Sequence, residues 1–290
     1  MKEADFWKPL KDKKVQCQLC PRNCVIGEGK VGFCNVRKNK EGKLYSLVYG
    51  KFCSIALDPI EKKPLYHFHP GSQVLSLATV GCNLRCSFCQ NWEISTAKEI
   101  RGQDLTPEQV VSIAKDYSAL GIAYTYTEPL IAIETYLEIM KIARKQGLFN
   151  VWVSNGYTNP EPAKKAAKYL DAINVDLKGS KKMYNELCAV PDDKPIYEAL
   201  KIYKQNKVHI ETTTLIVPGY NDDEKTLQGI VDWVKQNLGT ETPMHFSRFH
   251  PDHKLTNVPQ TPIETIKKAL EIAKKAGIKH VHAGNVPNLL

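Results

Sequence analysis

Three cysteines in one short run are the residues of this chain best suited to chemistry. Cys82, Cys86 and Cys89 follow the spacing Cys-x3-Cys-x2-Cys, and the next cysteine in the sequence is Cys188. A closed zinc or iron–sulfur site takes four protein ligands. Three thiolates on a four-iron cluster leave one iron free to bind another molecule, so the run predicts a reaction centre. The alternatives are a zinc loop, which usually brings paired Cys-x2-Cys units, and a ferredoxin site, which supplies all four ligands.

A second group of cysteines precedes this run. The chain has nine cysteines, an odd number, and eight of them fall within residues 17–89. In a chain of 290 residues this clustering favours metal or cluster ligation over disulfides. The four N-terminal members are Cys17, Cys20, Cys24 and Cys34. They predict a four-ligand site for zinc or for a second 4Fe–4S cluster. Cys53 and Cys188 are expected to be small buried hydrophobic residues.

Charge and hydropathy exclude several classes of protein. The net charge of +9 comes largely from lysines scattered along predicted helices. Solvated helix faces explain it more simply than a docking face for nucleic acid or an acidic protein. The first residues have no apolar segment typical of a signal peptide, and no stretch approaches the roughly 18 uncharged residues of a membrane span. We therefore expect a cytoplasmic protein.

The elements that must position the cysteines alternate between strands and helices. Strands are predicted at residues 74–80, 122–126, 150–154, 172–176, 208–216 and 244–249, with a further candidate at 279–283. Thr106 and Thr261 each begin a sequence typical of a capping box. The alternation predicts an α/β fold, a partial (β/α)6 TIM-like barrel over residues 73–290. Residues 1–72 are predicted to form a cysteine-rich N-terminal extension, irregular apart from a strand at 43–49. In such barrels active residues lie on the loops after the strands, where the cysteine run falls.

The run at residues 82–89 resembles the signature of the radical S-adenosylmethionine (SAM) superfamily. Phe88 stands directly before the last cysteine, and a predicted strand precedes the first. The resemblance implies a 4Fe–4S cluster on Cys82, Cys86 and Cys89, whose fourth iron chelates the amino and carboxylate groups of SAM. It also implies reductive cleavage of SAM to a 5′-deoxyadenosyl radical that abstracts a hydrogen from the substrate. A low-potential donor, a flavodoxin or a ferredoxin, would supply the electron.

A narrower resemblance covers almost the whole chain. The runs at residues 58–67, 124–129 and 248–252 are similar to those of enzymes related to the pyruvate formate-lyase activating enzyme, and among them to AmmeMemoRadiSam-type proteins. This resemblance implies a radical SAM oxidoreductase with one of two substrate classes. One is a glycine in a partner glycyl radical enzyme, and the other is a small molecule or protein modified through a Memo-type partner. A non-enzymatic metal protein that binds nucleic acid is a remote alternative.

The loops after the next two predicted strands carry residues that the resemblance assigns to SAM. Glu128 stands where the family usually has Gly-Gly-Glu, and its carboxylate suits the SAM ammonium. Ser154 and Asn155 stand in a polar turn suited to the SAM carboxylate or ribose. Val153 replaces an aspartate that in relatives helps to hold a monovalent cation beside SAM. The alternatives are a helix start at Glu128 and a simple turn at residues 154–156.

The remaining assignments concern SAM and the substrate. The resemblance implies that Asp176 orders the SAM end of the site and that Lys178 contacts the SAM carboxylate or the methionine product, with a surface ion pair as the alternative. Phe88 is expected to lie against the cofactor. The candidates for the substrate mouth are Thr212, Thr213, Thr214, His245, Arg248 and His250.

Overall fold

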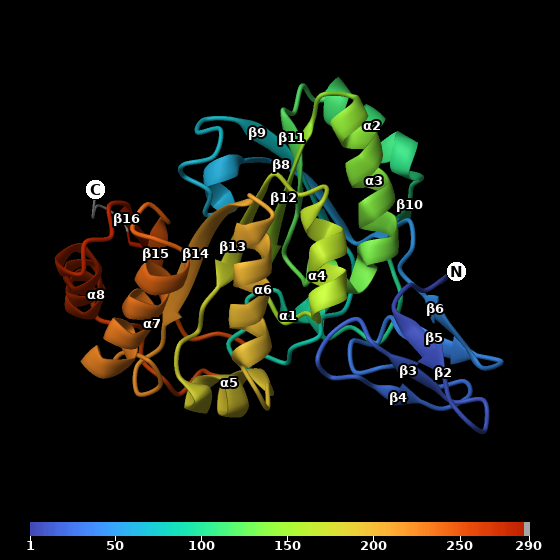
Figure 1. The fold of residues 1–290 in the computed structure, drawn as a ribbon, viewed down its shortest axis with the longest axis horizontal. Helices are drawn as coiled ribbons and strands as arrows, with labels where there is room; N and C mark the ends of the chain where they lie inside the picture. Colours follow the sequence, from blue (N-terminus) through green and yellow to red (C-terminus); the bar gives the residue numbers. More distant parts are fainter. Residues whose placement is uncertain (287–290) are drawn as a thin grey trace.

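The computed structural model describes residues 1–286, which are built around one twisted eight-stranded sheet (Figure 1). The strand order is β16-β15-β14-β13-β12-β11-β9-β8. All neighbours from β9 to β16 pair in parallel, and β8 pairs antiparallel with β9 at one edge. The bounds are β8 (Ser54–Pro59), β9 (Gln73–Ala78), β11 (Gly121–Tyr124), β12 (Phe149–Ser154), β13 (Ala172–Asp176), β14 (His209–Ile216), β15 (Met244–Arg248) and β16 (Val281–Gly284).

Helices connect the parallel strands and cover one face of the sheet (Figure 1). They are α1 (Trp92–Ser95), α2 (Pro107–Asp116), α3 (Ile133–Lys145), α4 (Pro160–Ala167), α5 (Lys181–Cys188), α6 (Lys194–Gln205), α7 (Glu224–Asn237) and α8 (Ile263–Lys275), with 3-10 turns η1 (Ile60–Lys62) and η2 (Pro129–Ala132). The capping box predicted at Thr106 is present. The one predicted at Thr261 is wrong, because α8 begins after Pro262 and the Thr261 hydroxyl instead bonds to Phe249 N and Ile216 O.

The α/β class and the partial barrel predicted from the alternation are confirmed, and every predicted strand of the sheet is present. The prediction missed β8, and the sheet therefore begins before residue 73. This edge strand has only three consecutive apolar residues, exposes Leu57, buries Asp58 and ends in a proline, so its apolar signal is short and weak.

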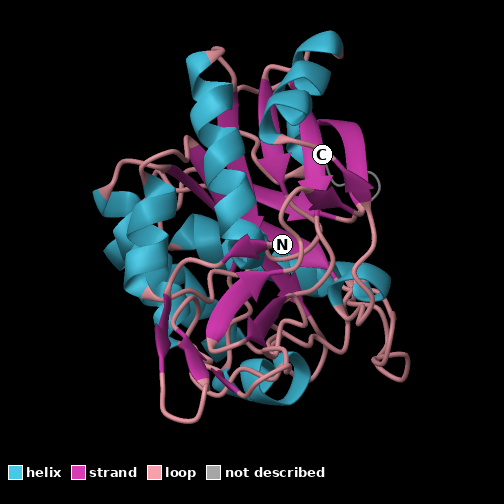
Figure 2. Ribbon diagram, turned by 90° about the vertical axis from the view of Figure 1, so that its right-hand side faces the viewer, coloured by secondary structure: helices cyan, strands magenta, loops and turns pink. Residues whose placement is uncertain are grey.

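Residues before β8 form short strands rather than the irregular chain that was predicted. Two three-stranded sheets have the orders β1-β6-β5 and β2-β3-β4, and β7 pairs with β10. The bounds are β1 (Lys2–Glu3), β2 (Trp7–Pro9), β3 (Val15–Cys17), β4 (Val25–Ile26), β5 (Arg37–Lys40), β6 (Lys43–Ser46), β7 (Lys51–Phe52) and β10 (Gln103–Asp104). The two three-stranded sheets lie below the main sheet in Figure 1 and face the viewer in the lower part of Figure 2.

The N-terminal strands share one hydrophobic core with the barrel. Val15 and Val36 belong to the same buried cluster as Leu77, Val80 and Ile131. Burial of this apolar surface fixes the N-terminal segment against the barrel end where β9 stops. Within residues 1–286, no helix is both long enough and apolar enough to cross a membrane.

Candidate active site

A cavity of about 460 Å³ opens at the carboxyl ends of the parallel strands. The nine residues predicted for the cluster and SAM all line it, and they are Cys82, Cys86, Phe88, Cys89, Glu128, Ser154, Asn155, Asp176 and Lys178. They come from the ends of β12 and β13 and from the loops that follow β9, β11, β12 and β13. The carboxyl ends of neighbouring parallel strands meet at one edge of a sheet, which explains how residues so distant in sequence share one cavity.

The loop that carries the three cysteines turns sharply at Gly81. Its φ is +93°, and a Cβ there would lie 2.5 Å from the carbonyl oxygen of Cys34, so only glycine fits. After the turn the loop wraps around the guanidinium of Arg85, which donates to the carbonyls of Cys82 (2.7 Å) and Leu84 (2.8 Å). This loop is therefore fixed by its own arginine before any cofactor binds.

The three cysteines are free thiols in this structure. Burial raises the pKa values of Cys82 and Cys89. Backbone N–H of Leu84 points to the Cys82 sulfur at 3.4 Å, and the Ser95 hydroxyl lies 3.4 Å from the Cys89 sulfur. Metal binding requires the thiolates, so each thiol must release its proton as a metal arrives.

Cys188 lies beside the cysteine run although it is distant in sequence. It is fully buried at the end of α5, as predicted, whereas Cys53 is only partly buried. A hydrogen bond between the Cys86 and Cys188 thiols, together with burial, raises the pKa of Cys86. The carbonyl of Cys188 also accepts from Arg85 N at 3.2 Å. A fourth thiol thus neighbours the three, which sequence spacing could not reveal.

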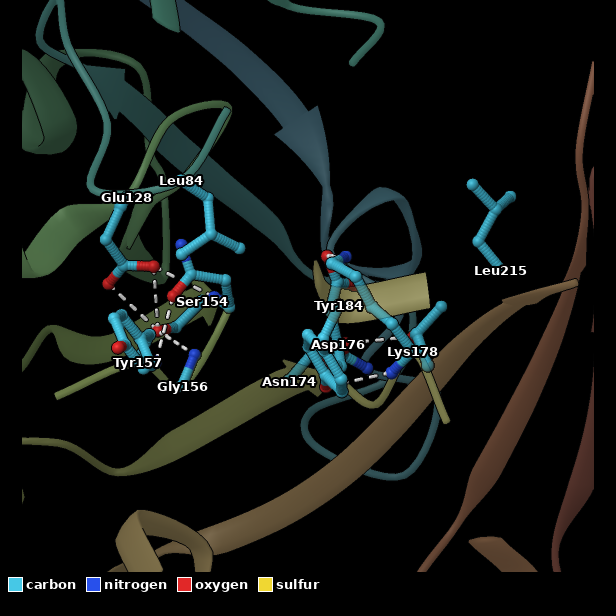
Figure 3. A network of polar contacts seen from close by, with 12 residues as sticks. Leu84, Glu128, Ser154, Gly156, Tyr157, Asn174, Asp176, Lys178, Tyr184 and Leu215 are labelled. Atoms are coloured by element: carbon cyan, nitrogen blue, oxygen red, sulfur yellow. Dashed lines mark hydrogen bonds and ion pairs between the residues drawn. The ribbon is translucent and has the colours of Figure 1, made fainter. Parts of the chain in front are cut away.

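Glu128 lies at the centre of a buried polar cluster (Figure 3). Its carboxylate accepts from the Ser154 hydroxyl (2.9 and 3.1 Å), Asn155 N (2.9 Å) and Leu130 N (3.1 Å). Burial raises the pKa of Glu128 to about 7, although these hydrogen bonds oppose the rise. The Asn155 amide donates to Asn83 Oδ1 at 2.9 Å, which connects this cluster to the cysteine loop. A carboxylate buried so deeply is suited to a cationic ligand.

Lys178 forms a second polar group, drawn near the centre of Figure 3. Its ammonium lies 2.9 Å from Asp176 Oδ2 and 5.5 Å from the centre of the Phe88 ring. Burial by itself lowers the pKa of Lys178, but Asp176 and the neighbouring cysteines Cys86 and Cys188 hold it well above its ordinary value. The Lys178 side chain is buried, although that of Asp176 is partly exposed, so this ion pair does not lie on the surface. The cavity therefore presents a fixed cation opposite the carboxylate of Glu128.

The residues predicted for the substrate mouth differ in where the structure places them. Thr213 lines the cavity, but strand alternation turns Thr212 and Thr214 away from it. His250 lies at the rim, with its Nε2 2.8 Å from the side-chain nitrogen of Gln90.

His245 and Arg248 do not line the cavity. His245 is wrong as a mouth residue because it lies near the start of β15, where its Nε2 is 2.6 Å from the buried carboxylate of Glu211. Arg248 instead donates to Thr261 O at 2.6 Å.

Sequence reasoning missed a polar group on the opposite wall of the cavity. Tyr126 lines the cavity with a φ of +65°, and its hydroxyl donates to Asp58. Asp58 also pairs with the buried Lys63 at 2.8 Å. Burial by itself raises the pKa of Asp58, but the hydrogen bonds from Lys63 and Tyr126 hold it well below its usual range. Asp58 and Lys63 both lie in the run at residues 58–67. Their opposite charges were the feature of the sequence that could have predicted this ion pair.

The four N-terminal cysteines meet at a smaller cavity beside the cysteine loop. Cys17, Cys20, Cys24 and Cys34 all line it. Burial raises the pKa of Cys20 to about 12 and that of Cys34 to about 11. Among residues 1–286, no three His, Cys, Asp or Glu side chains are gathered closely enough to hold a single metal ion as the side chains stand.

This fold and site define a class of protein. Residues 76–233 match the family model of the radical SAM superfamily, and the chain belongs to that superfamily. It is 50% identical over 289 residues to MJ0808 of Methanocaldococcus jannaschii, described as uncharacterized, covering 99% of this chain and 86% of that protein. It is 23% identical to the pyruvate formate-lyase-activating enzyme of Clostridium pasteurianum, covering 67% of this chain and 87% of that enzyme.

Solved structures show the same fold. A radical SAM methyltransferase from Sphaerobacter thermophilus superposes with a TM-score of 0.57 at 15% identity, covering 76% of this chain and 68% of that one. Streptococcus suis SuiB bound to S-adenosylmethionine superposes with a TM-score of 0.58 at 14% identity, covering 74% of this chain and 52% of that one. At these identities the likeness concerns the fold alone.

Proposed function

We propose that this chain reductively cleaves SAM at a 4Fe–4S cluster held by Cys82, Cys86 and Cys89. Membership of the radical SAM superfamily implies both the cluster and SAM. The observation that carries the proposal is the shared cavity, into which three thiols, a buried carboxylate and a buried ammonium all open. Thiolates are the ligands that iron–sulfur clusters take. When bound, the cluster and SAM supply a 5′-deoxyadenosyl radical for hydrogen abstraction.

The residues of the cavity have complementary roles toward SAM. We assign the carboxylate of Glu128 to the SAM ammonium and the ammonium of Lys178 to the SAM carboxylate, since opposite charges in a buried site attract strongly. Ser154 and Asn155 hold Glu128 in place by donating to it. Phe88, which lies under the Lys178 ammonium, excludes water from this end of the cavity.

The test is anaerobic reconstitution of the protein with iron and sulfide, followed by dithionite and SAM. We expect release of 5′-deoxyadenosine and methionine, and Cys86→Ala should abolish it. Ser87→Ala is the matched control, because Ser87 lies in the same loop but does not line the cavity. A reconstituted protein that releases neither product, or a Cys86→Ala variant with full turnover, would contradict the proposal.

A second candidate concerns the substrate. The likeness to the Clostridium pasteurianum pyruvate formate-lyase-activating enzyme favours hydrogen abstraction from a glycine of a partner protein. A small molecule, or a protein modified through a Memo-type partner, is the alternative. With SAM and a flavodoxin or ferredoxin as electron donor, the first reading predicts a glycyl radical signal in the partner by electron paramagnetic resonance. Uncoupled SAM cleavage with every glycyl radical candidate would favour the second reading.

A further inference from the structure

The cavity of the four N-terminal cysteines is built from two adjoining turns. Cys17 ends β3, and its backbone N–H donates to the carbonyl of Cys24 at 2.9 Å, which closes the turn that contains Cys20. Cys34 follows in the next turn, where Asn35 N donates to Gly32 O at 2.9 Å. Cys17, Cys20 and Cys34 are buried and Cys24 is partly exposed. Backbone hydrogen bonds therefore hold the four cysteines around one small cavity.

Arg37 lines the same cavity and is incompletely paired. It is only 1% exposed, and its Nη2 donates to Asp5 O and to Glu134 Oε1, both at 2.6 Å. Its Nε and Nη1 are buried and have no hydrogen-bond partner. Leaving a buried donor unpaired destabilises the folded protein, and more so for a charged group. Because buried N–H groups are nearly always hydrogen-bonded, these two beside four cysteines indicate that an anionic acceptor binds in the same cavity.

We propose that Cys17, Cys20, Cys24 and Cys34 hold a second metal centre, a tetrathiolate site with net negative charge that accepts hydrogen bonds from Arg37. Four thiolates around one Zn²⁺, or around an oxidised 4Fe–4S core of charge about +2, both leave a net charge of about −2. The shared chemistry is thus an anionic metal–thiolate centre. Binding releases the thiol protons and draws the sulfurs inward, since in their present positions no three share an ion site.

The centre also supports the radical SAM loop. Arg22 lies between Cys20 and Cys24, and it donates to Asn83 O (2.5 Å) in that loop and to Ala189 O (2.6 Å) after α5. Its guanidinium lies 3.4 Å from the centre of the Phe33 ring, on which Arg85 also lies at 4.5 Å. A metal that fixes the turn around Arg22 therefore fixes the loop that carries Cys82.

Metal analysis of a variant that lacks the other cysteine site tests this inference. In Cys82→Ala/Cys86→Ala/Cys89→Ala, purified without oxygen, we expect about one zinc, or about four irons and four sulfides, per chain. Adding Cys20→Ala and Cys34→Ala should remove that metal. Plasma mass spectrometry and the visible absorption band distinguish zinc from a cluster. A triple variant with native circular dichroism and no bound metal overturns the inference, as does metal that persists without Cys20 and Cys34.

A second pair of variants tests the role of Arg37. Arg37→Met/Glu134→Leu removes both members of the buried ion pair, so neither charge is left alone. We expect a chelator to remove the metal from this double variant about tenfold faster than from the parent protein. Removing groups that hold metal ligands typically weakens metal binding by about that factor. Lys2→Met, which removes a surface pair with Glu138, is the control. An unchanged rate overturns the role of Arg37. These variants need no SAM cleavage, so failure here is distinguishable from failure of the proposed function.

Discussion

The pKa of Glu128 predicts how the affinity for SAM depends on pH. Burial raises this pKa to about 7 in the unliganded protein, and only the ionised carboxylate attracts an ammonium. Protons therefore compete with SAM below pH 7. At pH 6 about one molecule in eleven has Glu128 ionised, so the dissociation constant of SAM should rise about tenfold, or about 1.4 kcal/mol. At pH 8 the carboxylate is almost fully ionised and affinity should reach its plateau.

Anaerobic calorimetry of SAM binding to the reconstituted protein from pH 6 to 8 measures this effect. Glu128→Gln cannot ionise, so it should bind SAM at least about tenfold more weakly at pH 8 and show little dependence on pH. The amide also cannot accept from both Asn155 N and Leu130 N, which leaves one buried N–H unpaired and costs about 1–3 kcal/mol of folding stability.

Ser154→Ala is the matched control for the loss of a hydrogen bond, because it removes one donor to Glu128 but keeps the carboxylate. It should retain pH-dependent binding, with the midpoint moved upward since a bond to the ionised form is lost. Equal SAM affinity at pH 6 and pH 8 in the parent protein, or wild-type affinity in Glu128→Gln, would show that the Glu128 carboxylate does not bind the SAM ammonium.

Three other contacts in the structure can be tested by substitution or by pH. Arg22→Ala should lower the iron content of the reconstituted protein, because one hydrogen bond to the cysteine loop and one to the segment after α5 are lost; unchanged iron would contradict this. Gly81→Ala should destabilise the protein by about 3 kcal/mol in urea unfolding, because its Cβ meets Cys34 O, and a neutral effect would refute it. Burial alone would raise the pKa of Glu211, but hydrogen bonds from His209 and His245 outweigh burial and lower this pKa from 4.5 to about 2. The ionised carboxylate should therefore contribute about 3 kcal/mol to the free energy of unfolding above pH 4.5, and this contribution should be lost as the pH falls toward 2. Glu211→Gln should remove this pH dependence from the midpoint of urea unfolding.

The sequence predicted the barrel and the nine cavity residues because both depend on local signals. Apolar runs mark the parallel strands, and the candidate residues, which the resemblance to radical SAM enzymes singled out, stand at the ends of these strands or in the loops that follow. The rule that strand ends share an edge then brings Cys82, Glu128 and Lys178 together. His245 was assigned to the substrate mouth although it stands near the start of β15 rather than after its end. The position of a residue along its strand decides at which end of the barrel its side chain lies.

Contacts between distant segments could not be predicted. Cys188 meets Cys86 only because α5 packs against the cysteine loop through Ser87 N and Leu187 O, 2.8 Å apart. Arg37 belongs to a strand that sequence reasoning did not find, and its pairing with Glu134 on α3 depends on the shared core. Nothing in the local sequence marks either contact.

We propose that three thiols hold the cluster and leave one iron for SAM, although Cys188 lies beside them. Cys188→Ala distinguishes three ligands from four, with iron content and 5′-deoxyadenosine release measured after reconstitution. We predict that Cys188→Ala keeps a full cluster and cleaves SAM, whereas Cys86→Ala loses both. Loss of the cluster in Cys188→Ala, with a parent cluster whose spectrum SAM does not change, would mean that four cysteines close the site and that no iron is free for SAM.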